Sequence, residues 1–171
     1  FVGFNRRFSK YINEIRKHTE KRINPLFITY RMNAGFVPLD HWIHESGGRI
    51  VGELCHIIDL VTSLTKSIIV SISFENLIPQ NQKFSKTDTI SCILKYADGS
   101  IANLNYFAVG SKELEKEYME IHFDEKSIIL NDYKSLKGLG LKINEIKTEK
   151  SEKGHIEELE VVYNYLKNRN S

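Results

Sequence analysis

The chain has 171 residues, of which 41% are hydrophobic and 27% are charged. These fractions are close to globular averages, so they exclude a disordered, collagen-like or fibrous protein, and the length predicts a single domain. A formal net charge of +2 is too small to indicate nucleic-acid binding by itself.

The amino-terminal segment 1–8 begins with neither an initiator Met nor the basic and apolar regions of a signal peptide. We expect it to form a short strand, which needs a sheet to join. This leads us to expect that the chain is a piece of a longer polypeptide. Seven basic residues between positions 6 and 22, against two acidic ones, predict a solvated helix face.

Helix and strand periodicities follow one another along the chain. Ser9 is expected to cap a helix over about residues 10–22, and a run of β-forming residues predicts a strand over 26–32. Apolar residues at positions 50, 54, 57, 58, 61 and 64 predict a helix over 49–65 that is buried along one broad face. Alternating patterns predict strands over 68–74, 89–96, 101–107, 118–123 and 127–130, with weaker ones at about 132–136 and 141–147. An amphipathic helix is predicted over 156–166.

Two hairpins are indicated, one by the Asp98-Gly99 pair and one around residues 124–126. Hairpins in series, with helices between and after them, predict an α+β domain: a mainly antiparallel, open mixed sheet with helices packed on one face. Such a sheet leaves its other face to be buried. We therefore expect a homodimer or homotetramer formed through that face.

The helix over 49–65 carries ionisable residues at intervals of three or four, which places them on one stripe: Arg49, Glu53, His56 and Asp59. A half-buried imidazole beside carboxylates titrates near neutrality, as general acid/base catalysis requires. The alternative is a core histidine bonded to Asp59 or to the backbone.

A metal site is a weaker alternative. His41 and His44 are three residues apart, and Glu53, Cys55 and His56 add further ligand types. A metal-dependent hydrolase or isomerase could use the three histidines, but an ordinary loop with two polar histidines fits the same pattern.

Cys55 and Cys92 lie in apolar surroundings, which predicts buried, reduced thiols in a cytoplasmic protein. The sequence has no run of about 18 apolar residues and no basic patch interleaved with aromatics, so neither a membrane nor nucleic acid is expected as a partner.

Four motifs resemble, in order, the second half of Gfo/Idh/MocA oxidoreductases, and most of all the branch called bi-domain oxidoreductases. They are VGFNRRFS at 2–9, YRMNAG at 30–35, DHW at 40–42 and GGRIVGELCHIID at 47–59. The resemblance implies that residues 1–8 end a missing amino-terminal Rossmann domain, which holds NAD or NADP, and that residues 9–171 form a substrate-binding and oligomerisation domain. No cofactor site is complete in this chain, so none is expected to bind to it.

The resemblance also implies roles for single residues. His56 matches the histidine that exchanges a proton with the substrate hydroxyl while hydride moves to or from the cofactor. Asp59 matches a residue expected to orient that histidine. Gly52 stands where many relatives have Asp, so the neighbouring Glu53 is the candidate replacement. The residues expected to bind substrate are Arg31, Asn33, His41, Trp42 and Arg49.

We therefore expect the carboxyl-terminal half of an NAD(P)-dependent oxidoreductase that acts on a hydroxyl or keto group of a sugar or nucleotide-sugar. The alternative is a non-catalytic scaffold or regulatory binding module that retains the sheet without the chemistry. Gly52 motivates this alternative, because a carboxylate is missing there.

Overall fold

The computed structural model describes residues 2–45 and 47–169. Its helical segments are η1 (Asn5–Phe8), α1 (Lys10–Thr19), η2 (Trp42–His44), the π-helical turn η3 (Ile50–Leu54), α2 (Cys55–Thr65) and α3 (His155–Arg169). Its strands are β1 (Phe27–Asn33), β2 (Ile69–Asn76), β3 (Ile90–Tyr96), β4 (Ile101–Phe107), β5 (Glu117–Phe123), β6 (Lys126–Asn131), β7 (Ser135–Leu139) and β8 (Ile146–Lys147).

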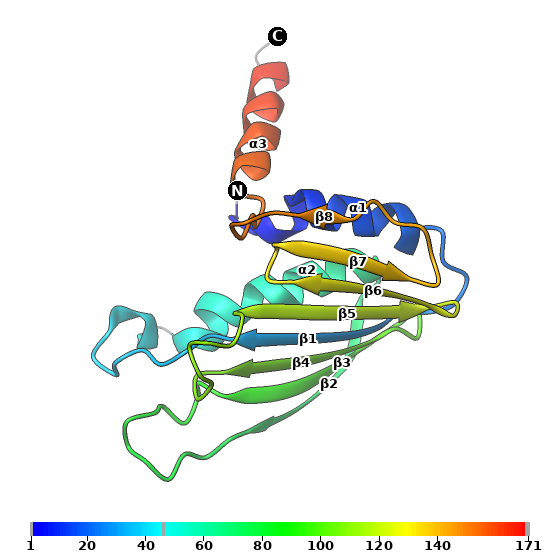
Figure 1. The fold of residues 1–171 in the computed structure, drawn as a ribbon. Coiled ribbons are helices and arrows are strands. Elements are labelled where there is room, and N and C mark those ends of the chain that lie inside the picture. The colour runs from blue at the N-terminus through cyan, green and yellow to red at the C-terminus, as the bar shows by residue number, and fades with distance from the viewer. Residues whose placement is uncertain (1, 46, 170–171) are drawn as a thin grey trace.

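The strands form one open sheet of eight strands in the order β2-β3-β4-β1-β5-β6-β7-β8 (Figure 1). The first strand in the chain lies near the centre, where it pairs in parallel with β4 and antiparallel with β5. The remaining pairs of neighbouring strands among the described residues are antiparallel. The sheet is therefore mixed but mainly antiparallel, as the sequence predicts.

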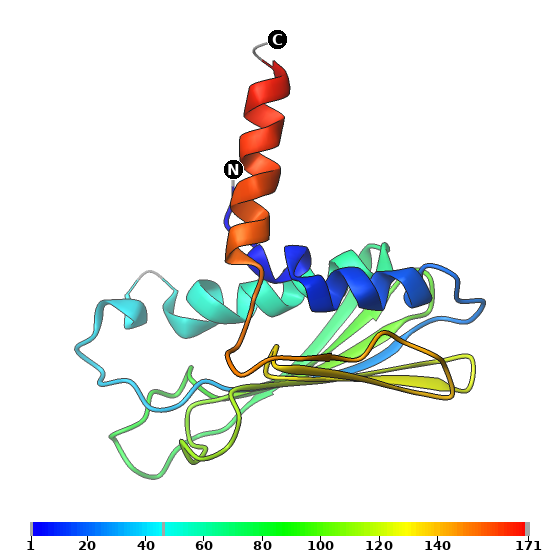
Figure 2. The ribbon, with the colours of Figure 1, turned by 45° about the horizontal axis from the view of Figure 1, so that its top comes forward.

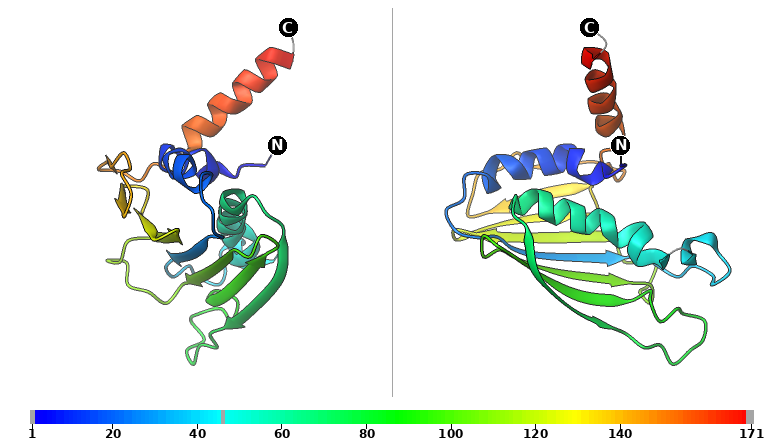
Figure 3. Two further views of the ribbon diagram at one scale, coloured as in Figure 1. Left: turned by 90° about the vertical axis from the view of Figure 1, so that its right-hand side faces the viewer. Right: turned by 180° about the vertical axis from the view of Figure 1, so that it is seen from behind.

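Helices α1 and α2 lie side by side across one face of the sheet, and its other face is bare (Figures 2 and 3). The hydroxyl of Ser9 accepts a hydrogen bond from the backbone N–H of Ile12 (3.3 Å), which confirms the predicted helix cap. Helix α2 ends at Thr65, because the next residue, Lys66, has a positive φ of 55°. This arrangement confirms the predicted α+β class.

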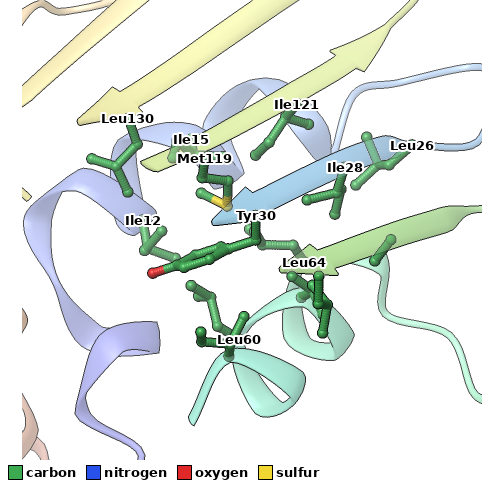
Figure 4. Packing of buried hydrophobic residues seen from close by; sticks show 14 of the residues in the cluster. Ile12, Ile15, Leu26, Ile28, Tyr30, Leu60, Leu64, Met119, Ile121 and Leu130 are labelled. Atoms are coloured by element: carbon green, nitrogen blue, oxygen red, sulfur yellow. The ribbon is translucent and has the colours of Figure 1, made fainter. Parts of the chain in front are cut away.

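The core lies between this helical layer and the sheet (Figure 4). Alternate residues of each central strand point inward, and the apolar faces of both helices meet them. Tyr30 extends from β1 between Ile12 of α1 and Leu60 of α2. Burying each large apolar side chain contributes roughly 1.5–3 kcal/mol, so this layer holds the two helices on the sheet.

The expected strand at residues 1–8 is wrong. Residue 1 lies outside the described residues, and η1 is a turn of 3-10 helix. Two polar side chains of this segment are buried against distant partners instead of facing solvent from a strand. The Nδ2 of Asn5 donates to the carbonyl of Lys153 (2.8 Å), and Arg6 binds Glu117. The solvated basic face is also wrong for Arg6, which is buried.

Several boundaries differ from those predicted. The helix expected over 10–22 ends at Thr19. The two weak strands lie later, as β7 and the two-residue β8, because Asp132 and Tyr133 adopt positive φ angles of 47° and 52° and form a turn. Positive φ is costly in a strand for residues other than glycine. The sheet continues only beyond this turn.

Helix α3 stands away from the sheet, and its base contacts η1 (Figures 1 and 2). The chain enters it through Gly154, whose φ is +86° and where a Cβ would lie 2.5 Å from Asn5 O and Ser9 N. Only glycine fits this approach of backbone to backbone. Beyond its base the helix exposes apolar side chains: Ile156, Leu159, Val161, Tyr163, Tyr165 and Leu166.

Candidate functional site

The carboxylate of Glu53 is the centre of a polar cluster at the start of α2. Lys116 Nζ lies 2.6 Å from its Oε1, and Oε2 accepts from the Tyr106 hydroxyl (2.6 Å) and from Arg49 (3.2 Å). Burial alone would raise the pKa of Glu53, but Lys116 and Tyr106 outweigh it and the pKa is lowered. The carboxylate is therefore ionised near neutral pH and engaged by three donors.

The π-helical turn η3 places this carboxylate. Arg49, at the start of the turn, is buried and donates to the carbonyls of Gly35 (2.6 Å) and Ala34 (3.1 Å). The same guanidinium lies over the ring of Tyr106, 5.6 Å from its centroid. Such π-turns within helices occur frequently at functional sites. The loop that leaves β1 is thus tied to the helix that carries Glu53 and His56.

A cavity of about 500 Å³ opens at the carboxyl end of β1. Its walls are the loop after β1 and the loop before β5, and they are formed by Asn33, Ala34, Gly35, Phe36 and residues 112–116. Lys116 belongs both to this wall and to the Glu53 cluster. The cavity is therefore linked to η3, which leads into α2, through the Lys116–Glu53 ion pair and through Arg49, which binds the carbonyls of Ala34 and Gly35.

His56 lies on α2 one turn after Glu53 and is half-buried. The ring of Phe4 meets it edge-on, with centroids 5.6 Å apart and an interplanar angle of 90°. Its Nδ1 is buried and has no hydrogen-bond partner among the described residues. Burial, followed by the charge of Arg6, lowers the pKa of His56 below its ordinary value, which favours the neutral imidazole.

We expected Asp59 to orient His56, but among the described residues its carboxylate is bonded to Arg7 and makes no hydrogen bond to the imidazole. Its carboxylate is bound in a bidentate manner by Arg7, with Nε 2.7 Å from Oδ2 and a second contact from the other guanidinium nitrogen to Oδ1. The pairing joins η1 to α2. Asp59 therefore fixes the amino-terminal segment that carries Phe4.

Asn33 and Arg31 have different positions. Asn33 is buried, and its Nδ2 donates to the carbonyls of Ser111 (2.6 Å) and Leu114 (3.3 Å), which holds the loop before β5. Arg31 donates to the carbonyl of Glu115 and packs over the ring of Tyr118. Arg31 is not among the residues that line the cavity, and its expected role in substrate binding stays a prediction.

His41 and Trp42 also lie apart from that cavity. The Nδ1 of His41 caps η2 by accepting from the N–H of Ile43 (3.2 Å), and Trp42 is 70% exposed beside a separate hollow of about 220 Å³. His44 instead approaches Asp88, with 3.6 Å between Nδ1 and Oδ1. Their expected role in substrate binding stays a prediction for these loop residues.

The structure does not support the alternative hypothesis of a metal site. Within residues 2–45 and 47–169, no three His, Cys, Asp or Glu side chains form a group that could hold a metal ion. Cys92 is buried as predicted, whereas Cys55 is only half-buried, and both are free thiols. No helix in the described part of the chain is long and apolar enough to cross a membrane.

A second polar cluster was not found from the sequence. Glu117 is 1% exposed and accepts from Arg6, from the Tyr30 hydroxyl (2.5 Å) and from Lys153 (2.5 Å). It is in phase with the inward-facing Met119 of β5, and an acidic residue at such a position indicates a buried partner. Lys116 and Tyr106 were also missed, since neither belongs to a recognisable motif.

No family model matches the sequence, and no curated protein sequence matches it significantly. Solved structures do match its fold. UDP-N-acetylglucosamine 3-dehydrogenase GnnA from Acidithiobacillus ferrooxidans has a TM-score of 0.69 at 18% identity, over 91% of this chain and 48% of that one. A levoglucosan dehydrogenase in complex with NADH and levoglucosan has a TM-score of 0.65 at 18% identity, over 86% of this chain and 47% of that one.

The fold is also found in the super-repressor mutant of Gal80p from Saccharomyces cerevisiae, with a TM-score of 0.68 at 16% identity over 93% of this chain and 49% of that one. The chain thus spans about half the length of the solved structures that it matches. These findings confirm the predicted fold, which makes up about half of each of these chains.

Proposed function

We propose that this domain is the substrate-binding half of an NAD(P)-dependent oxidoreductase that acts on a hydroxyl or keto group of a sugar. The observation that carries the proposal is the environment of His56: a half-buried, neutral imidazole whose Nδ1 has no partner among the described residues. A neutral imidazole with an unpaired ring nitrogen is suited to move a proton. The fold shared with sugar dehydrogenases supports the same reading.

The residues of this chain would bind the substrate and handle the proton. The neutral imidazole of His56 accepts the proton of a hydroxyl as it is oxidised, and returns it when a keto group is reduced. Glu53 contributes a fixed negative charge one turn away and positions Lys116. Asp59 and Arg7 hold η1, so that the ring of Phe4 restricts the imidazole.

A nicotinamide dinucleotide would supply the hydride chemistry when bound. The described residues fit one wall of such a site and not the whole of it. They present an imidazole and the Phe4 ring, but the sequence has no glycine-rich turn between a strand and a helix to hold a pyrophosphate. The dinucleotide would therefore be held mainly by another part of the parent polypeptide.

The surface around η1 is suited to meet that other part. The short η1 segment contacts both α2 and α3, so His56, Phe4 and the base of α3 lie close together. The exposed apolar side chains of α3, among them Leu159 and Tyr163, would be covered there. We propose that a nucleotide-binding domain of the parent polypeptide docks on this side.

The bare face of the sheet supports the proposal of a homo-oligomer. Phe27 and Ile93 expose about half of their surface there, at 49% and 47%, and the buried Oδ1 of Asn103 has no partner within the described residues. A second copy packed face to face would bury these groups. Light scattering tests this proposal, because a monomer would contradict it.

A cytoplasmic location, with its reduced thiols, also stays a prediction.

The decisive experiment is His56→Ala in the complete polypeptide, with sugar oxidation followed by the absorbance of the reduced dinucleotide. We expect turnover to fall by about 10² or more with a smaller change in KM, as for a lost general acid/base. His18→Ala on α1 is the matched control and should leave turnover unchanged. Normal turnover in the His56 variant would refute the role.

A regulatory binding module is the second candidate. It is favoured by the likeness to Gal80p, a protein described as a repressor, and by Gly52, which leaves no carboxylate at the position four residues before His56. The two functions differ in what the complete polypeptide does with a dinucleotide and a sugar. Binding of both without any conversion, unaltered in the His56→Ala variant, would favour the regulatory module.

A further inference from the structure

We propose that the cavity at the end of β1 takes an uncharged, polyhydroxylated ring, and that Lys116 is the residue that selects it. The inference rests on the proposed function, since it names the part of the sugar substrate that this chain would hold. It concerns Lys116, Phe36 and the loop over 112–116, which line the cavity.

Lys116 is a fixed donor with unused capacity. Its Nζ is held 2.6 Å from the carboxylate of Glu53, yet its side chain is 40% exposed and belongs to the cavity wall. An ammonium group has three N–H donors, and Glu53 takes one of them. The others remain for oxygen atoms of a ligand in the cavity. Because Glu53 already bonds Tyr106 and Arg49, the ammonium is held by an anchored partner.

The charges around the cavity balance. Its lining contains two lysines, Lys112 and Lys116, and two glutamates, Glu113 and Glu115. Behind Lys116, the charge of Glu53 is matched by that of Arg49. Lys134 pairs with Glu115 (2.9 Å), but it also pairs with Asp132 (3.1 Å) and so adds no net positive charge. A phosphate or carboxylate would therefore find no net positive field in the cavity. Hydroxyl groups both donate and accept, so they can use the ammonium and the carboxylates together.

The remaining walls suit a rigid ring. Phe36 lines the cavity, and its own ring is held edge-on by Phe84 with centroids 5.5 Å apart. Asn33 fixes the opposite loop through the carbonyls of Ser111 and Leu114, so the cavity is formed before a ligand arrives. A volume of about 500 Å³ lies within the range of small-molecule sites.

The test is an NMR titration of this chain with levoglucosan and, separately, with glucose 6-phosphate. We expect levoglucosan to shift the amide signals of residues 34–36 and 112–116, and the phosphorylated sugar to bind there more weakly. Lys116→Met should weaken levoglucosan binding by about tenfold, as for the loss of a hydrogen bond from a charged donor. Lys116→Arg should retain most of the affinity. Lys95→Met, which removes the same charge from an exposed position on β3, is the control.

Three results would overturn the proposal: tighter binding of glucose 6-phosphate, unchanged affinity in Lys116→Met, or no shift of the cavity signals at high sugar concentration. The proposed function is judged separately by the His56 variant of the complete polypeptide. If that variant loses turnover while the sugar shifts only signals near Phe4 and His56, the oxidoreductase stands and the cavity assignment fails. If the cavity binds the sugar and the His56 variant keeps full turnover, the binding site stands and the catalytic role fails.

Discussion

Arg6 and Glu117, 111 residues apart in the sequence, form a buried bidentate ion pair with contacts of 2.9 and 3.0 Å. The pair joins η1 to the first residue of β5, and Lys153 adds a contact from the segment that leads into α3. The same carboxylate thus ties three distant parts of the chain together, next to the helix that carries His56.

Removing one partner of this pair should strongly destabilise the domain. In Glu117→Gln the guanidinium of Arg6 would stay buried without a counter-charge, so we expect the free energy of unfolding to fall by about 3 kcal/mol or more. Urea unfolding followed by circular dichroism measures it. Glu120→Gln, on the exposed face of the same strand, should change it by less than about 0.5 kcal/mol. Equal effects of the two changes would contradict this account.

Protonation of the Glu117 carboxylate should make the free energy of unfolding depend on pH. Burial alone would raise the pKa of Glu117, but Arg6 and Lys153 outweigh it and lower the pKa from 4.5 to about 2. Because the folded-state pKa is the lower one, its contribution is present above pH 4.5 and is lost as the pH falls toward 2. Unfolding curves between these pH values should lose this part of their pH dependence in Glu117→Gln. An unchanged dependence would show that other groups cause it.

Phe4 should control the titration of His56. Its ring covers the imidazole edge-on, and burial is the main cause of the lowered pKa. We therefore expect Phe4→Ala to raise the pKa of His56 toward its ordinary value, measured by NMR on the ring protons. Phe27→Ala removes a similar ring, which lies beside His122, and should leave the titration of His56 unaltered. A pKa that falls or stays in Phe4→Ala would exclude this role.

Two glycines near the site should respond oppositely to alanine. At Gly110 a Cβ would lie 2.3 Å from Asn33 Oδ1 and 2.7 Å from the ring of Phe107, so Gly110→Ala must displace the carboxamide that holds the loop before β5. We expect a loss of about 1–3 kcal/mol. At Gly52 the nearest atom is 3.7 Å away, and the position is helical. Gly52→Ala should be neutral or stabilise by up to about 1 kcal/mol. Thermal unfolding of both variants would separate these expectations.

The sequence predicted those helices and strands in which the spacing of apolar residues matches the buried face of the element. The strands β3 and β4, the helix that carries His56 and the Ser9 cap follow from local patterns, because one face of each meets the core. The strand predicted at residues 1–8 was wrong because the conformation of this segment depends on Lys153 and Glu117, which lie far away in the chain. A local pattern contains no information about such partners.

The candidate site was predicted in part for the same reason. Helical spacing placed Arg49 and Glu53 together, and they are bonded. Lys116 and Tyr106, which complete the cluster, come from a loop and from β4, and the register that brings them to Glu53 is set by the sheet. Asp59 was assigned to His56 through the resemblance and its spacing on the helix, but its carboxylate is bound in a bidentate manner by Arg7, from the amino-terminal segment.

The position of β1 in the sheet determines the order in which this domain can fold. Tyr30 of β1 lies opposite Leu104 of β4 and Met119 of β5, so both edges of this strand remain unpaired until much later residues arrive. Contacts so distant in sequence make folding slow. During synthesis, the first hundred residues would hold two helices with uncovered apolar faces and a strand with open edges, a state prone to aggregation. A chain that stops after β3 should therefore fail to fold, although it contains His56, Glu53 and the whole of α2.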